Sequence, residues 1–242
     1  MKISTCSLLF VVFSLSCCTV ISPSYTTGKI VRKDKAGLTS IPPEILSDSS
    51  ITTLSLFGNQ LTEIPKSITQ LKKLEVLYLG KNQLEHFPEI LCELSNLRVL
   101  SLAYNRIDSI PNSIFKLKKL EWIYLNNNRL VYLGDSIGNL PALQQLFLQR
   151  NELKQLDNRI YSNEKLQVLD LGNNFLEAIP DGIEQLNQLK ELRLYRAGYL
   201  VALPESICEM RFLERLLVDR QTVLPACIYT RKTNRLLIQI LD

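Results

Sequence analysis

The sequence predicts an α/β solenoid, in which short parallel strands alternate with short helical or 3₁₀ segments on the outer side. Three observations carry this prediction. Six asparagines recur every 23 residues without slippage, and a fixed period of this size is typical of repeat arrays. The residues before each asparagine alternate leucine with variable positions, which indicates a short strand. An Ile-Pro step or a variant of it follows, and proline favours the start of a helical turn. The six asparagines are Asn59, Asn82, Asn105, Asn128, Asn151 and Asn174.

The asparagines are polar where their neighbours are apolar. Stacked at the same point of every turn, each side-chain amide can bond backbone groups of the bend that ends the strand. A buried polar side chain is tolerable only when it is bonded in this way. The period therefore predicts a ladder of asparagines along the solenoid.

Each repeat is expected to point three sets of apolar residues inward. The strand leucines come first, then the residue two positions after each asparagine, and then an isoleucine or leucine on the inner face of the outer turn. Parallel strands need such a crossover, and the crossover is right-handed as a strong rule. The first strand set is Leu54, Leu77, Leu100, Ile123, Leu146, Leu169 and Leu192.

The full unit reads LxxLxLxxNxLxxIPxxIxxLxx, as in ITTLSLFGNQLTEIPKSITQLKK (51–73). This resembles the leucine-rich repeat family over about residues 30 to 241. The 23-residue form is similar to Ras-suppressor-type proteins and to bacterial, spirochaete-like secreted or lipoprotein leucine-rich repeat proteins. The resemblance implies a right-handed horseshoe or arc, with the parallel sheet on its concave side and the helical segments on its convex side. It implies no catalytic activity.

The repeat divides the chain into five predicted segments. They are a signal peptide (1–18), a short tether (19–29), an N-terminal cap half-repeat (30–50), seven repeats (51–212) and a degenerate repeat with a C-terminal cap (213–242). Lys33 replaces a core leucine in the first cap, and Ala197 replaces an asparagine near the other end. Ile238 and Ile240 are candidates for a last strand. We favour a degraded cap after Ala197, and the alternative is an insertion near a binding site.

Residues 1–20 resemble an export signal, with Lys2 before an apolar run from Leu8 to Leu15 that is too short to span a bilayer. The run ends at Cys17 and Cys18, in a relaxed form of a bacterial lipobox. We favour lipidation of Cys18 or Cys17, and the alternative is a plain signal peptide. The protein is then expected to be secreted or lipid-anchored at a bacterial cell envelope or outer surface.

Three cysteines lie within the repeats. Cys92 and Cys208 occupy the same phase five turns apart, roughly 24 Å at about 4.8 Å per turn, so these two cannot pair. Cys208 and Cys227 lie on neighbouring turns and could pair. Because the register after Ala197 is uncertain, we favour two buried thiols for this pair.

Outward-facing strand residues should form columns across the concave face, and two zones of these columns are the predicted ligand site. The first is aromatic and the second is charged. Exposed aromatics beside arginines are typical of protein interfaces, whereas strand propensity alone is the alternative explanation. The aromatic zone comprises Tyr78, Tyr104, Trp122, Tyr124 and Phe147, and the charged zone comprises Arg150, Asp170, Glu191, Arg193, Tyr195, Arg196 and Arg215.

The composition argues against several other functions. The net charge is +4 without a basic block, so no nucleic-acid partner is expected. His86 is the single histidine, and no paired carboxylates, Gly-rich phosphate loop or paired CxxC occurs, so we expect no enzyme, cofactor or metal site. An enzyme-targeting arm is a third hypothesis, but the repeats leave no room for a catalytic domain.

The sequence therefore predicts a non-enzymatic binding protein whose concave face holds a protein ligand, such as a host matrix or cell-surface protein. The membrane is expected as a partner only through the lipid anchor. The alternative function is a structural or self-associating envelope protein, with homo-oligomers formed through exposed strand edges or aromatics.

Overall fold

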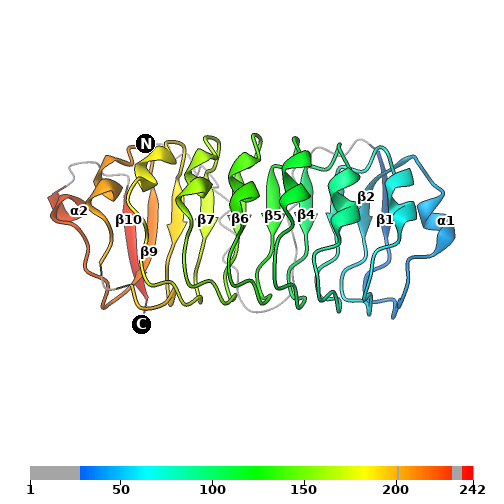
Figure 1. Cartoon of the computed structure of the whole chain (residues 1–242), viewed down its shortest axis with the longest axis horizontal. Coiled ribbons are helices and arrows are strands. Elements are labelled where there is room, and N and C mark those ends of the chain that lie inside the picture. Colours follow the sequence, from blue (N-terminus) through cyan, green and yellow to red (C-terminus); the bar gives the residue numbers. More distant parts are fainter. Residues whose placement is uncertain (1–27, 201, 231–235, 242) are drawn as a thin grey trace, which may run out of the picture.

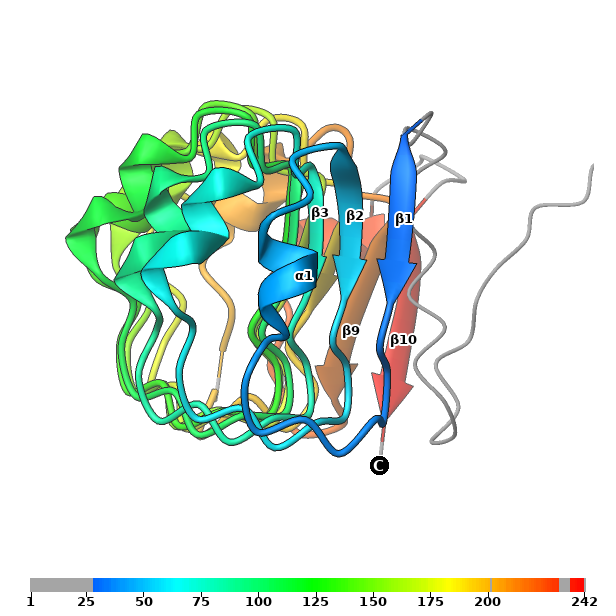
Figure 2. The same ribbon diagram turned by 90° about the vertical axis from the view of Figure 1, so that its right-hand side faces the viewer.

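A computed structural model of the chain describes residues 28–200, 202–230 and 236–241. It shows a right-handed α/β solenoid with one parallel sheet, whose ten strands lie in chain order (Figure 1). Figure 2 shows the two layers: the strands form one layer and the helical segments form the other. The fold class predicted from the 23-residue period is confirmed.

The strands are short, and each pairs with the strands before and after it in the chain. Their bounds are β1 (Lys29–Arg32), β2 (Ile51–Ser55), β3 (Val76–Tyr78), β4 (Val99–Ser101), β5 (Trp122–Tyr124), β6 (Gln145–Phe147), β7 (Val168–Asp170), β8 (Glu191–Arg193), β9 (Arg215–Asp219) and β10 (Leu237–Leu241).

The convex layer holds seven 3₁₀ segments between two short α-helices among the described residues. In order they are α1 (Pro43–Leu46), η1 (Lys66–Gln70), η2 (Glu89–Glu93), η3 (Asn112–Lys116), η4 (Asp135–Asn139), η5 (Asn158–Ser162), η6 (Ile183–Gln185), η7 (Glu205–Glu209) and α2 (Ala226–Thr230).

Proline starts several of the outer turns, as the sequence predicts. Pro65, Pro88, Pro111 and Pro204 are the residues that cap the N-termini of η1, η2, η3 and η7.

Hydrogen bonding holds neighbouring strands about 4.8 Å apart, whereas a helical turn with its side chains is wider. This difference in width makes the sheet the inner side of the arc.

The three predicted sets of inward residues form one continuous core. Leu54, Leu100 and Leu146 of the strand set are fully buried, as are Leu61 and its counterparts after each asparagine. The inner residues of the outer turns are at most 1% exposed; they are Ile68, Leu91, Ile114, Ile137, Ile160 and Ile183.

The asparagines form the predicted ladder, and each one joins two turns. Asn128 is representative: its Nδ2 donates to Leu125 O at 2.9 Å in its own turn and to Leu102 O at 3.0 Å in the turn before. Its Oδ1 accepts from Ile107 N at 3.0 Å. The residue before it, Asn127, has a φ of 56°, the left-handed conformation that produces the bend. One side chain thus satisfies three backbone groups.

The ladder ends where the repeat changes. Ala197 takes the place of an asparagine and is fully buried, and the next residue, Gly198, has a φ of 135°. A Cβ at Gly198 would lie 2.3 Å from Leu176 N, so only glycine fits. Here Leu176 and Gly198 form an isolated bridge, which replaces the side-chain amide with direct backbone pairing.

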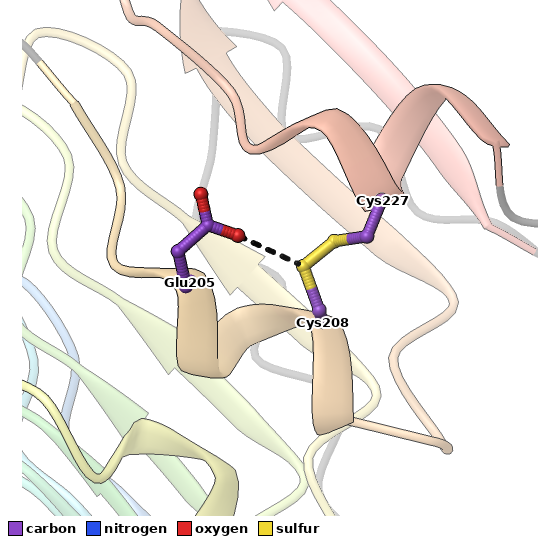
Figure 3. The surroundings of a disulfide bond; sticks show 3 residues. All are labelled: Glu205, Cys208 and Cys227. Atoms are coloured by element: carbon purple, nitrogen blue, oxygen red, sulfur yellow. Dashed lines mark hydrogen bonds between the residues drawn. A yellow bond between two sulfur atoms is a disulfide. The ribbon is translucent and has the colours of Figure 1, made fainter.

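Cys208 and Cys227 form a disulfide, and the prediction of two buried thiols is wrong (Figure 3). The register beyond Ala197 places η7 and α2 so that the two Cα atoms lie 5.9 Å apart, within the usual range for a disulfide. With a sequence separation of 19, this bridge stabilises the C-terminal turns by about 3 kcal/mol in the chain-entropy model. Cys92 is a free, buried thiol, as expected.

The signal peptide, the lipidation candidates Cys17 and Cys18, and the tether as far as residue 27 lie outside the described residues. Within the described ranges, no helix has the length and apolar character needed to cross a membrane. Lys29, the last residue of the predicted tether, begins β1.

Replacing Asn128 with leucine should lower the free energy of unfolding by about 3 kcal/mol or more, because three buried backbone groups lose their partner. Urea denaturation measures the change. The matched control is Asn139→Leu, at an exposed asparagine of η4, where a change within about 0.5 kcal/mol is expected. Equal losses in the two variants would show that the ladder contributes nothing special.

Candidate functional site

The strand register brings the predicted columns together on the concave face. Tyr124 of β5 lies between Ser101 of β4 and Phe147 of β6, and Phe147 lies beside Asp170 of β7. Asp170 in turn lies beside Arg193 of β8. Trp122 begins the neighbouring column, between Val99 and Gln145. The aromatic and charged zones therefore meet in the middle of the sheet.

Tyr124 and Phe147 form a parallel stack, with ring centroids 4.7 Å apart and an interplanar angle of 2°. Strand spacing in a sheet is about 4.8 Å, so rings at the same register cover one another. The prediction that all the aromatics are exposed is therefore wrong for Phe147, which is 7% exposed. Tyr78, Trp122 and Tyr124 are half-buried.

Tyr124, Trp122 and Gln149 place polar atoms among the half-buried side chains of the concave face. Burial raises the pKa of Tyr124 well above its ordinary value, and the neighbouring Tyr78 adds to this rise. The Tyr124 hydroxyl therefore remains a hydrogen-bond donor at neutral pH. Trp122 Nε1 and Gln149 Oε1 have no hydrogen-bond partner among the described residues, and such groups are normally satisfied by protein, water or ligand.

The charged zone is an ion-pair chain across three strands. Arg193 Nη1 lies 3.1 Å from Asp170 Oδ2, and Arg193 Nε donates to Glu191 Oε1 at 2.7 Å. Glu191 Oε2 lies 3.6 Å from Arg215 Nη1. The Arg193 guanidinium also lies 5.9 Å from the centroid of the Phe147 ring. Arg193 thus joins the two zones that the sequence separates.

Asp170 is fully buried, so the prediction that it faces a ligand directly is wrong. Its Oδ1 accepts from the Gly172 N–H at 3.1 Å, and its other oxygen contacts Arg193. Burial raises the pKa of Asp170, while the Arg193 charge and the Gly172 N–H oppose that rise. Asp170 therefore positions Arg193 from beneath.

Tyr104, Arg150 and Arg196 lie outside the strand columns. Each has a φ between 49° and 58° and occupies the bend that follows its strand. Their side chains are exposed, so they border the C-terminal edge of the concave face. Tyr195 is half-buried in the next column, where its ring covers Gly172; a Cβ there would lie 2.7 Å from the ring.

One ion pair beside the site is absent from the prediction. Arg98 donates to Glu121 Oε1 from Nη2 at 2.6 Å and from Nε at 3.0 Å, and Glu121 is 9% exposed. The sequence does contain a pattern that indicates this pair: Arg98 and Glu121 carry opposite charges, stand 23 residues apart, and each directly precedes a strand. This pair fixes the chain directly before Trp122.

Two hollows of the described surface lie outside the aromatic zone. One is lined by Glu63, His86 and Arg106 in the loops after the strands. Another lies near the C-terminal turns, beside Phe175, Tyr199 and Arg220.

The comparisons with known proteins agree with this geometry. The model described as leucine rich repeat matches residues 49–107 and 95–153, and a second leucine rich repeat model matches residues 165–186. A comparison with curated protein sequences finds no match. The chain belongs to the leucine-rich repeat family.

Three solved structures are similar to the chain, and each match covers 84% of it. A leucine-rich repeat protein of Leptospira interrogans is 36% identical, with a TM-score of 0.77 and 52% of its own length covered. The ectodomain of the Arabidopsis thaliana receptor kinase GASSHO1/SCHENGEN3, in complex with CASPARIAN STRIP INTEGRITY FACTOR 2, is 28% identical, with a TM-score of 0.72 and 25% covered.

The third structure, PEPR1-AtPEP1, is 24% identical with a TM-score of 0.66 and 33% of its length covered, and it supports the fold alone. The chain thus spans about half the length of the Leptospira protein and a third or less of the other two.

Replacing Arg193 with leucine should cost about 3–5 kcal/mol of stability at neutral pH, because Asp170 stays buried without its cation. The pKa of Asp170 should then rise further above its ordinary 3.8. A raised carboxyl pKa contributes stability that is fully present below the unfolded value and is lost as pH rises through the folded value.

The variant should therefore lose stability as the pH rises above the ordinary carboxyl value of 3.8, more steeply than the wild type, in urea denaturation at several pH values. The double variant Asp170→Asn/Arg193→Leu is the control, and its stability should vary little over that range. If the stability of the Arg193→Leu variant did not change with pH, the role of Arg193 as the cation that pairs with buried Asp170 would be contradicted.

Proposed function

We propose that the chain is a non-enzymatic binding protein that holds a protein ligand on its concave face. One observation carries the proposal: Tyr124 of β5 and Arg193 of β8 both pack against the buried Phe147 ring of β6, and Trp122 lies on the same face of β5. Aromatic rings and arginine side chains dominate the energetics of protein interfaces. The proposed ligand therefore contacts the middle of the sheet rather than its ends.

The site is preorganised, which favours binding. The Tyr124–Phe147 stack and the ion pairs of Arg193 hold these side chains before a ligand arrives. Ordering a free side chain costs about 0.5–1.5 kcal/mol on binding, and here that cost falls on folding instead.

The relatives support the class of ligand. The Arabidopsis ectodomain is described in complex with CASPARIAN STRIP INTEGRITY FACTOR 2. By analogy, the proposed partner of this chain is a protein or peptide segment. In the exported setting that we propose below, an extracellular protein such as a host matrix or cell-surface protein is the candidate class.

The double variant Trp122→Ala/Tyr124→Ala should weaken capture of the ligand by about 30-fold to 700-fold, because central interface aromatics contribute about 2 kcal/mol each and their contributions are not fully additive. Proteins cross-linked to the wild type from extracts of candidate tissues are identified first, and their affinities are then measured with purified components. The matched control is Tyr132→Ala/Phe212→Ala, which removes two aromatics that are 60% and 56% exposed outside the strands.

The control should bind as the wild type does, and circular dichroism should show that both variants are folded. If the concave double variant retained the affinity of the control for every identified partner, the concave-face proposal would fail.

We also propose export and lipid anchoring of the chain. The Cys208–Cys227 disulfide supports export, since disulfides persist mainly in oxidising compartments. The apolar run before Cys17 and Cys18 supports a lipoprotein signal. An acylated cysteine adds enough apolar carbon for stable anchoring when more than one chain is attached.

Labelled palmitate should enter the wild-type chain in a Gram-negative host and should be lost from Cys17→Ala/Cys18→Ala. The single variants then show which cysteine carries the lipid, and Cys92→Ala, at a buried thiol, is the control. A processed, secreted chain without label would contradict the anchor and leave plain secretion.

A further inference from the structure

The last strand, β10, leaves one edge of the sheet open. It pairs with β9 through Leu237–Arg215 to Leu241–Asp219, and no described residue pairs with its outer edge. Its residues, LIQIL, carry no charge. Leu237 and Ile240 are 59% and 57% exposed. An exposed, uncharged edge strand is a template for pairing with another chain.

The opposite edge of the sheet is protected. β1 carries Lys29 and Arg32 among its four residues, and its pairing with β2 is irregular between Lys29 and Ile30. Charged side chains, especially lysine, and bulges are the usual devices that prevent edge pairing. The two ends of one sheet therefore differ, and only the β10 end lacks these devices.

The sequence of β10 is a palindrome about Gln239. In an antiparallel pair of two copies with a two-fold axis at Gln239, Leu237 lies opposite Leu241 of the other copy, and Ile238 lies opposite Ile240. Residues directly opposite in an antiparallel pair point to the same face. Each leucine of β10 then lies opposite a leucine of the other copy, each isoleucine lies opposite an isoleucine, and Gln239 lies opposite Gln239 of the other copy.

The backbone of β10 has the hydrogen-bonding phase that this register needs. The Leu237 N–H donates to Glu214 O at 2.8 Å, toward β9. Since successive residues of a strand alternate in direction, the N–H and C=O groups of Ile238 and Ile240 point to the open edge. These are the residues placed opposite one another, so each Ile238–Ile240 pair exchanges both of its backbone bonds.

The same register also closes the end of the core. Ile238 and Ile240 lie beside Leu216 and Val218 of β9, which are 0% and 1% exposed. Ile238 packs against the core cluster, whereas Ile240 is mostly exposed. A second copy would cover Ile240 with its own Ile238 and continue the core across the axis.

We infer that β10 is a homodimer interface, through which two copies join their sheets edge to edge about a two-fold axis at Gln239. The contact is isologous, so it closes at two copies and uses up the edge of each. A head-to-tail array would require β10 to pair with the charged, irregular edge of β1. The interface lies at the C-terminal end of the arc (Figure 1) and is independent of the concave-face ligand.

The test uses the full chain and measures its molar mass by light scattering and its dimer dissociation constant by sedimentation. The wild type should reach twice the 27.7 kDa of the chain. Gln239→Lys and Gln239→Glu each place like charges opposite one another across the axis, which should raise the dissociation constant roughly fivefold to tenfold. Gln239 is exposed on the strand, so the monomer fold should be unaffected.

An equimolar mixture of the two variants should recover the dimer, because the only pair across the axis in a mixed dimer is Lys–Glu. Gln221→Lys, at an exposed residue after β9, is the matched control and should dimerise as the wild type does. Trp122→Ala/Tyr124→Ala should also dimerise, which separates this interface from the concave site.

A monomeric wild type at all concentrations would overturn the inference. So would species larger than a dimer, or single variants that associate as tightly as their mixture. A wild type that binds its ligand but does not dimerise would refute the β10 interface alone, and a wild type that dimerises but captures no ligand would refute the concave-face proposal alone.

Discussion

The asparagine ladder is the interaction on which the rest of the structure depends. In each 23-residue repeat, the chain must bend sharply after the strand. That bend leaves backbone carbonyl and N–H groups inside the molecule, where water cannot reach them. Each ladder asparagine donates to carbonyls of two turns and accepts an N–H from the turn before, as Asn128 does with Leu102, Leu125 and Ile107. Unpaired buried groups of this kind cost about 1–3 kcal/mol each, so the ladder makes a polar bend compatible with an apolar core.

The ladder also determines the functional surface. Because every turn is locked to the next at the same point, the strands stay in register and their outward residues stack in straight columns. Two consequences follow at the middle of the sheet. Tyr124 and Phe147 stack face to face, and Arg193 reaches both Phe147 and Asp170. Where the ladder stops at Ala197, direct backbone pairing at Gly198 and the Cys208–Cys227 disulfide hold the last turns instead.

The ends of the arc differ in a way that the repeat does not reveal. The N-terminal edge carries Lys29 and Arg32 and an irregular pairing, whereas the C-terminal edge is an uncharged strand. Repeat proteins bury their core by stacking, so the terminal turns expose whatever no neighbour covers. Ile240 is an example, since its counterparts in earlier turns are buried and it is not. This asymmetry gives the chain one end suited to contact with a second copy.

The sequence by itself determined the solenoid, the parallel strand order, the inward residues and the columns of the concave face. It could do so because each turn packs only on its neighbours, and a strict period therefore sets every register at once. The tertiary structure alone decided which column residues are accessible. Phe147 is covered by the Tyr124 ring and the Arg193 side chain, and Asp170 pairs with Arg193; single-residue patterns do not contain that packing. It also decided the disulfide, because the placement of η7 beside α2 brings the Cα atoms of Cys208 and Cys227 within 5.9 Å.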